Sequence, residues 1–175
     1  MKIHLLLFAF LLMGSSLVFA QKEFRTRFSI GPEIGLATSN PLDGIPGNKG
    51  WGLGIGGSAQ VEHFFREQVS GSLYAGMIGF AGRSASSNTK NKAYTTIPVR
   101  AGINYYLGNR IHLGAHLGVG FNSFNSESAT AFAYSPQIGY NFSRNDKPLD
   151  LTLKYDGYAG NGGFSALGLR LSLIL

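Results

Sequence analysis

Apolar residues alternate with small or polar residues along most of the chain after about residue 23. The alternation is clearest between Ile111 and Asn122, where aliphatic and aromatic residues interleave with histidine, glycine and asparagine. Successive side chains of a β-strand point to opposite faces of a sheet. The pattern therefore predicts strands that have one apolar face and one polar face.

Alternation and turn signals together predict eight strands. They span residues 24–36, 51–63, 68–82, 94–107, 111–122, 132–142, 149–157 and 164–175. Within the third segment, Ile78 and Phe80 are out of phase with the apolar residues before them, which predicts a β-bulge. An even number of antiparallel strands lets a sheet close with both chain ends on one side.

The predicted connections alternate in length. Short links cover residues 64–67, 108–110 and 143–148, whereas longer polar segments cover residues 40–50, 83–93, 123–131 and 157–163. Short turns at one rim and long loops at the other are typical of outer-membrane barrels, whose turns are periplasmic and whose loops lie outside the cell. This layout predicts four extracellular loops.

Composition favours a membrane protein built from strands. Charged residues make up 14% of the chain, against roughly 25% in soluble domains. The formal net charge is +6, but the basic residues are scattered singly, so the sequence does not indicate a nucleic-acid surface. The chain has no cysteine, which excludes disulfides and thiolate metal sites.

The first 20 residues have the features of a secretory signal peptide. Lys2 precedes an unbroken apolar run from Leu5 to Met13, and small residues surround the predicted cleavage site after Ala20. This run is too short to cross a bilayer as a helix, which needs about 20 residues. We therefore expect residues 1–20 to be removed on export and residues 21–175 to form one barrel domain.

Alternation alone does not say which face of the barrel meets the outside, because a soluble lipocalin-like barrel turns its apolar face inward. Here the polar face consists mainly of glycine, serine, asparagine and glutamine, which fit a narrow interior. Aromatic residues near the strand ends predict two belts at the membrane interfaces. The predicted belts are Trp51, Tyr94, Phe121, Phe132 and Phe164 at the loop rim, and Phe24, Phe64, Phe65, Tyr105 and Phe142 at the turn rim.

On this pattern the chain resembles the small outer-membrane β-barrel domain family, the OmpX/OmpA-type eight-stranded barrels. The resemblance implies an all-β fold: a closed eight-stranded antiparallel up-and-down transmembrane β-barrel. It also implies the outer membrane of a Gram-negative bacterium, with membrane lipids, lipopolysaccharide and the barrel assembly machinery as partners. One difference is the end of the chain at Leu175, where members often have an aromatic residue.

The charged residues of the polar face are predicted to form a network inside the barrel. They are Arg25, Arg27, Glu33, Glu62, Arg100, Lys154, Asp156 and Arg170. Unpaired charges in a confined interior are costly, so Arg25 or Arg27 is expected to pair with Glu62 on the neighbouring strand. Glycines such as Gly52 and Gly54 are expected to leave room for arginine side chains. Eight strands enclose space for side chains only, so a diffusion pore is not expected.

No catalytic, cofactor or metal residues are predicted. The glycines from Gly52 to Gly57 match a dinucleotide-binding pattern, but they continue a strand where that motif requires a turn and a helix. His112 and His116 share a strand face at a separation of roughly 13 Å, which is too far for one metal ion. Both are expected to form hydrogen bonds inside the barrel.

The sequence favours a structural or surface-interaction role in the outer membrane. Two alternatives stay open: a small-ligand barrel, either lipocalin-like or binding within a narrow lumen, and a lipid-modifying enzyme. In the second long loop, Arg83, Lys90 and Lys92 are candidate contacts for lipopolysaccharide phosphates. The simpler interpretation is that these residues keep the loop soluble.

Overall fold

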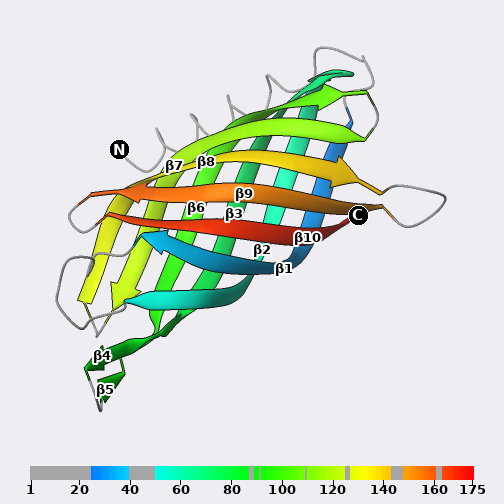
Figure 1. The fold of residues 1–175 in the computed structure, drawn as a ribbon. Helices are drawn as coiled ribbons and strands as arrows, with labels where there is room; N and C mark the ends of the chain where they lie inside the picture. Colours follow the sequence, from blue (N-terminus) through cyan, green and yellow to red (C-terminus); the bar gives the residue numbers. More distant parts are fainter. Residues whose placement is uncertain are drawn as a thin grey trace, which may run out of the picture.

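The computed structural model describes residues 25–39, 50–86, 89–90, 92–108, 110–124, 127–142, 148–160 and 163–175. Within these residues the chain forms a closed antiparallel barrel with the strand order β1-β10-β9-β8-β7-β6-β3-β2 (Figure 1). The barrel strands are β1 (Thr26–Ser39), β2 (Trp51–Arg66), β3 (Val69–Gly82), β6 (Tyr94–Leu107), β7 (Ile111–Phe124), β8 (Glu127–Asn141), β9 (Leu149–Ala159) and β10 (Phe164–Ile174). A separate two-stranded sheet joins β4 (Ser84–Ser86) to β5 (Thr89–Lys90). The predicted fold class is confirmed.

The barrel closes between its first and last strands, as the sequence predicts. Ile30 pairs with Leu173, Glu33 with Arg170, and Ile34 with Leu169 in an antiparallel register. In hydrocarbon an open sheet edge would leave backbone N–H and C=O groups without partners, so this closure is what permits the sheet to span a membrane.

The two ends of the barrel differ. At the turn end, β1 begins, β10 ends, and two tight connections follow β2 and β6. At the loop end, β1, β3, β7 and β9 end. Figure 1 shows β4 and β5 beyond the barrel at the loop end, opposite the C-terminus.

The aliphatic residues face outward. Ile55 is 69% exposed and Leu73 is 65% exposed, although both lie in the middle of long strands. Arg100, on the inward face of β6, is 2% exposed. This arrangement matches a barrel surrounded by lipid and is the reverse of a lipocalin-like barrel. The described part of the chain contains no helix with the length and hydropathy needed to cross a bilayer.

Two local predictions are wrong. Ile78 and Phe80 are paired without any register shift, and both point into the barrel, where they are 2% and 1% exposed. The prediction of a bulge assumed a polar interior throughout, whereas this end of the interior is apolar. In addition, residues 127–131, predicted as loop, belong to β8 and pair with β7 as far as Glu127 opposite Phe124.

The aromatic belts are only partly as predicted. Phe65, Tyr105, Phe121, Phe132 and Phe142 face outward, but Trp51, Tyr94, Phe64 and Phe164 are buried inside the barrel. Tyr94, Phe64 and Phe164 alternate with the outward-facing residues of their strands, so their side chains point inward. Nearness to a strand end therefore does not identify the aromatic residues that face the membrane. Trp51 turns inward because the β2–β3 register shifts between Trp51 and Gly54. Phe24 lies outside the described residues.

Candidate functional site

The centre of the barrel holds a buried charge network around Glu33 on β1. Lys154 Nζ donates to Glu33 Oε2 at 2.6 Å, and the Tyr74 hydroxyl donates to both carboxylate oxygens at 2.9 Å. Lys154 Nζ also lies 2.9 Å from the Tyr74 hydroxyl oxygen and 4.7 Å from its ring centroid. Because all three side chains are almost fully buried, the ion pair needs this complete set of hydrogen bonds to offset its desolvation.

Asp156 forms the second acidic position of the network. Its carboxylate accepts from Arg100 Nη1, from the Ser135 hydroxyl at 2.8 Å, and lies 3.2 Å from Lys154 Nζ. The Arg100 guanidinium also covers the Tyr74 ring, with 4.4 Å between the guanidinium carbon and the ring centroid. Lys154 therefore links the two carboxylates into one network that joins β1, β3, β6, β8 and β9.

Arg170 on β10 completes the network. Its Nε donates to the Ser58 hydroxyl at 2.8 Å and lies 3.5 Å from Glu33 Oε1, while Nη2 donates to the Ser29 hydroxyl at 3.0 Å. The described interior thus contains as many carboxylates as cations. The carboxylates are Glu33, Glu62, Asp150 and Asp156, and the cations are Arg27, Arg100, Lys154 and Arg170. With neutral histidines, the interior carries no net charge.

Apolar and aromatic side chains fill the loop end of the interior. Phe164 packs at centroid distances of 4.8 Å from Phe80 and 4.7 Å from Tyr94, and Tyr94 packs at 4.9 Å from Trp51. We call this group the aromatic cluster; it consists of Trp51, Ile78, Phe80, Tyr94, Ala133, Tyr158, Phe164 and Ala166. Gly54 is needed here, because a Cβ at this position would lie 2.6 Å from the Phe80 ring. The cluster fills this end of the interior.

The turn end of the interior is polar. Glu62 accepts from the Tyr106 hydroxyl at 2.8 Å, from Ser70 at 2.5 Å and from Asn104 at 2.9 Å. The Tyr106 ring packs at a tilt against Phe64, with 5.1 Å between the ring centroids. Glu62 is therefore held by neutral donors, although it lies among charged residues.

Both interior histidines form the expected hydrogen bonds. His112 Nε2 lies 3.0 Å from Asp150 Oδ2, and His116 Nε2 lies 3.0 Å from the Ser72 hydroxyl and 3.1 Å from Asn104 Oδ1. Since a carboxylate only accepts, the proton of neutral His112 belongs on Nε2. Among the described residues, no three potential metal ligands come together.

The structure places the predicted network residues in three groups. Glu33, Arg100, Lys154, Asp156 and Arg170 meet in the centre, as described above. Glu62 and Arg27 are register partners near the turn end, but the structure gives no ion pair between them. Arg25 is exposed before the first residue of β1, so it does not belong to this network.

Sequence reasoning missed the two tyrosines that organise these groups. Tyr74 and Tyr106 lie on the polar face of their strands, and each donates its hydroxyl to a buried carboxylate. The signal was available, because a tyrosine at the inward parity of a narrow barrel needs a polar partner for its hydroxyl.

Basic residues at the loop end flank the β4–β5 hairpin. Arg83 and Lys92 are exposed, and the Ser84–Lys90 pairing brings their segments together. The Arg83 N–H donates to the Gly50 carbonyl at 2.8 Å, and Trp51 Nε1 donates to the Lys92 carbonyl at 2.9 Å. The Arg83 side chain crosses Gly52, where a Cβ would lie 2.5 Å from its Nε atom. Gly52 does leave room for an arginine, but that arginine belongs to a loop.

Known structures share this fold at low sequence identity. Ail, the attachment invasion locus protein of Yersinia pestis, matches with 16% identity and a TM-score of 0.58, over 88% of this chain and 100% of Ail. Neisserial surface protein A matches with 13% identity and a TM-score of 0.51, over 87% of this chain and 99% of that protein. A de novo designed transmembrane β-barrel matches with 12% identity and a TM-score of 0.51, over 89% of this chain and 100% of the design.

A comparison with curated proteins finds no match. Residues 6–166 match the family described as the outer membrane protein beta-barrel domain. Together with the outward aliphatic face and the closed sheet, this match assigns the chain: it belongs to the outer membrane protein beta-barrel domain family.

Proposed function

We propose that this protein is a structural or surface-interaction component of the outer membrane that acts through its loops, with residues 1–20 removed during export. The observation that carries the proposal is the filled interior beneath an outward aliphatic face. The aromatic cluster and the buried charge network occupy successive levels of the barrel. Because side chains fill the loop end and the centre of the interior, the surfaces left for this role are the loops and the rims.

The interior groups favour a role other than catalysis. A serine hydrolase requires a serine, a histidine and a carboxylate in one hydrogen-bonded relay. Here His116 contacts Ser72 but the structure gives it no carboxylate partner, and His112 contacts Asp150 but is given no serine partner. The components of the relay are thus divided between two histidines. This division supports a non-enzymatic role.

The loop-end cations support contact with lipopolysaccharide phosphates. The segment from Arg83 to Ala93 contains Arg83, Lys90 and Lys92 and no carboxylate. Arg83 and Lys92 are exposed and lie just beyond the loop-end termini of β3 and β6, so the headgroup phosphates around a lipid-embedded barrel would be within their reach. Ail, which has the same fold, has been solved in complex with the polyanion sucrose octasulfate, a heparin analogue. The hydrogen bond that Arg83 N–H donates to Gly50 and the one that Trp51 donates to Lys92 hold the base of the hairpin in place for such a contact.

Cell fractionation with gel electrophoresis tests the membrane proposal. We expect the protein in the outer-membrane fraction, requiring detergent for extraction and migrating differently before and after heating, because a closed barrel keeps its backbone bonds in detergent. Recovery as a detergent-free periplasmic protein would instead favour a small-ligand barrel. A mass change of lipopolysaccharide on overexpression would favour a lipid-modifying enzyme.

Fluorescence tests the phosphate contact. Trp51 is the single tryptophan of the chain and is bonded to the Lys92 carbonyl, so its emission reports on the hairpin base. We expect purified lipopolysaccharide to shift this emission saturably, and the R83A/K92A variant to bind severalfold more weakly. The matched control is R66A/R110A, which removes two exposed cations at the turn end. Equal binding by both variants, or equal binding of dephosphorylated lipopolysaccharide, would contradict the contact.

A further inference from the structure

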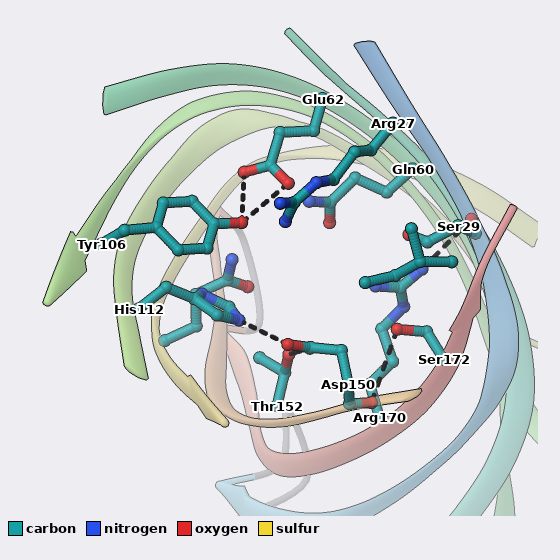
Figure 2. Close-up of a pocket in the computed structure, with 12 residues that line it drawn as sticks. Arg27, Ser29, Gln60, Glu62, Tyr106, His112, Asp150, Thr152, Arg170 and Ser172 are labelled. Atoms are coloured by element: carbon teal, nitrogen blue, oxygen red, sulfur yellow. Dashed lines mark hydrogen bonds and ion pairs between the residues drawn. The ribbon is translucent and has the colours of Figure 1, made fainter. Parts of the chain in front are cut away.

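A small polar pocket of about 20 Å³ lies in the turn end of the barrel (Figure 2). This space holds one or two water-sized groups. It is lined by Arg27, Ser29, Gln60, Glu62, Tyr106, His112, Gln137, Asp150, Thr152, Arg170, Ser172 and Ile174. Some of these side chains have all their hydrogen-bonding groups occupied by other residues of the protein, and others do not.

The two carboxylates of the pocket are occupied. Glu62 accepts from the Tyr106 hydroxyl with both oxygens at 2.8 Å and also from Asn104. Asp150 accepts from Thr152 at 2.6 Å and pairs with His112 at 3.0 Å. Neither carboxylate depends on an arginine of the pocket for its hydrogen bonds.

Arg27 is in the opposite situation. Its guanidinium carbon lies 4.5 Å from the Phe64 centroid and 5.8 Å from the Tyr106 centroid, so two aromatic rings position it. Across the described ranges, the structure gives Arg27 no hydrogen bond or ion pair, although Glu62 is its register partner. Arg27 is half-buried, and its five N–H donors are therefore available to an acceptor that enters the pocket.

Further donors lie beside Arg27. Figure 2 shows Arg27, Gln60 and Arg170 on one side of the pocket, with Tyr106 and His112 on the other. The Gln60 side chain makes no hydrogen bond to a described residue, so its amide N–H groups are also unused. Arg170 is bonded to Ser58 and Ser29, and Glu33, 3.5 Å from its Nε atom, offsets part of its positive charge.

We propose that this pocket binds a carboxylate group that enters from the turn end, with Arg27 donating two hydrogen bonds and Gln60 donating a third. The guanidinium fork matches the two oxygens of a carboxylate. Glu62 and Asp150 line the same small space and repel any anion, so a doubly charged phosphate fits less well than a singly charged carboxylate. The carboxylate comes from a small organic acid or from the C-terminus of a peptide at the barrel mouth.

NMR of the arginine Nε–Hε groups tests the proposal on the folded full barrel in a lipid nanodisc. We expect sodium acetate to shift the Arg27 signal saturably in the millimolar range, while sodium chloride at equal ionic strength does not. Because an Arg27 variant lacks this signal, acetate binding is compared between proteins on the Gln60 side-chain amide; R27Q should bind at least about tenfold more weakly, because the fork and its charge are lost. The matched control is R25Q, which removes an exposed arginine two positions away and should bind as the unmodified protein does.

A peptide with a free C-terminal carboxylate, compared with its amidated form, distinguishes the two sources. Selective binding of the free form identifies a peptide terminus, whereas binding of acetate alone identifies a small acid. If R27Q does not fold, R27K serves in its place, since it keeps the charge, lacks the fork and should weaken binding severalfold. A chloride shift equal to that of acetate, or unchanged acetate binding in the folded arginine variant, would overturn the proposal. Because none of these measurements uses the loops, the result is independent of the proposed surface role.

Discussion

The two ends of the barrel interior are filled in opposite ways. At the loop end, Trp51, Phe80 and Phe164 pack as in the core of a soluble protein. At the turn end, Glu62 and His112 form hydrogen bonds around a polar pocket. The buried charge network lies between them. The same strands thus enclose the packed aromatic cluster at one end and a polar pocket at the other.

This difference shows that the inward parity of a strand does not determine the polarity of the interior. β3 contributes Ser70 and Ser72 to the polar end, and Ile78 and Phe80 to the aromatic cluster, all from the same face. Aromatic packing excludes water, whereas a polar pocket of suitable size retains it. We therefore expect the interior to be accessible from the turn end alone.

Cysteine labelling gives the largest contrast between the two ends. The chain has no cysteine, so Gln60→Cys and Ile78→Cys each introduce the only thiol. We expect a small hydrophilic thiol reagent to modify Gln60→Cys in the folded barrel and to leave Ile78→Cys unmodified, because Ile78 lies within the aromatic cluster. Mass spectrometry measures the modified fraction.

Heat-unfolded samples of the two cysteine variants provide the control, since both should then be fully modified. Equal modification of the two folded variants would contradict the expectation that the interior is accessible from the turn end alone.

The charge network should give the largest loss of stability. Asp156→Asn keeps the shape of the side chain but takes from Arg100 the carboxylate it is paired with and leaves Lys154 with Glu33 alone. Breaking a buried ion pair from one side costs about 3–5 kcal/mol. Urea unfolding in lipid vesicles measures this change. Asp150→Asn is the matched change in the turn-end pocket and should cost less, because Asp150 is paired with His112 and Thr152; a smaller effect at Asp156 would contradict this order.

The aromatic cluster should contribute nearly as much. Phe80→Ala removes a ring that is 1% exposed and packs against Phe164, so we expect a loss of about 3 kcal/mol in the same unfolding assay. Phe64→Ala removes a ring at the turn end that is 8% exposed, and its cost should be smaller because water can fill the space. A larger loss for Phe64→Ala would show that the turn end is the better packed of the two.

Much of the fold is predictable because lipid imposes a strict rule. A period of two sets the strands, and the absence of backbone partners in hydrocarbon requires β1 to pair with β10. The predicted segment 94–107 agrees with β6 at both ends. Prediction fails where a strand extends beyond the residues that alternate between apolar and polar. The start of β8 is an example, because the apolar alternation ends there while strand pairing continues.

The interior was harder to predict because its contacts cross the barrel. Parity correctly places Glu62 beside Arg27, yet the carboxylate turns toward Tyr106 and Asn104 on β6, two strands away. The pairing of neighbouring strands does not reveal which donors from more distant strands lie within hydrogen-bonding distance of the carboxylate. Trp51 is a different case, because a one-residue register shift reverses its direction without any local sequence signal.

Glu62→Gln should give the smallest of these changes and sharpens the comparison within the polar end. The substitution keeps one acceptor oxygen and places an N–H₂ group where the Tyr106 hydroxyl donates, so one hydrogen bond is lost. We expect a loss of about 1–2 kcal/mol, visible as a lower temperature for the heat-induced gel shift. Gln60→Ala removes a neighbouring pocket side chain that makes no hydrogen bond or ion pair with the described residues, so it should change this temperature less. If Glu62→Gln were as damaging as Asp156→Asn, Glu62 would have to be paired with Arg27 in the membrane, and the free guanidinium that the carboxylate pocket requires would not exist.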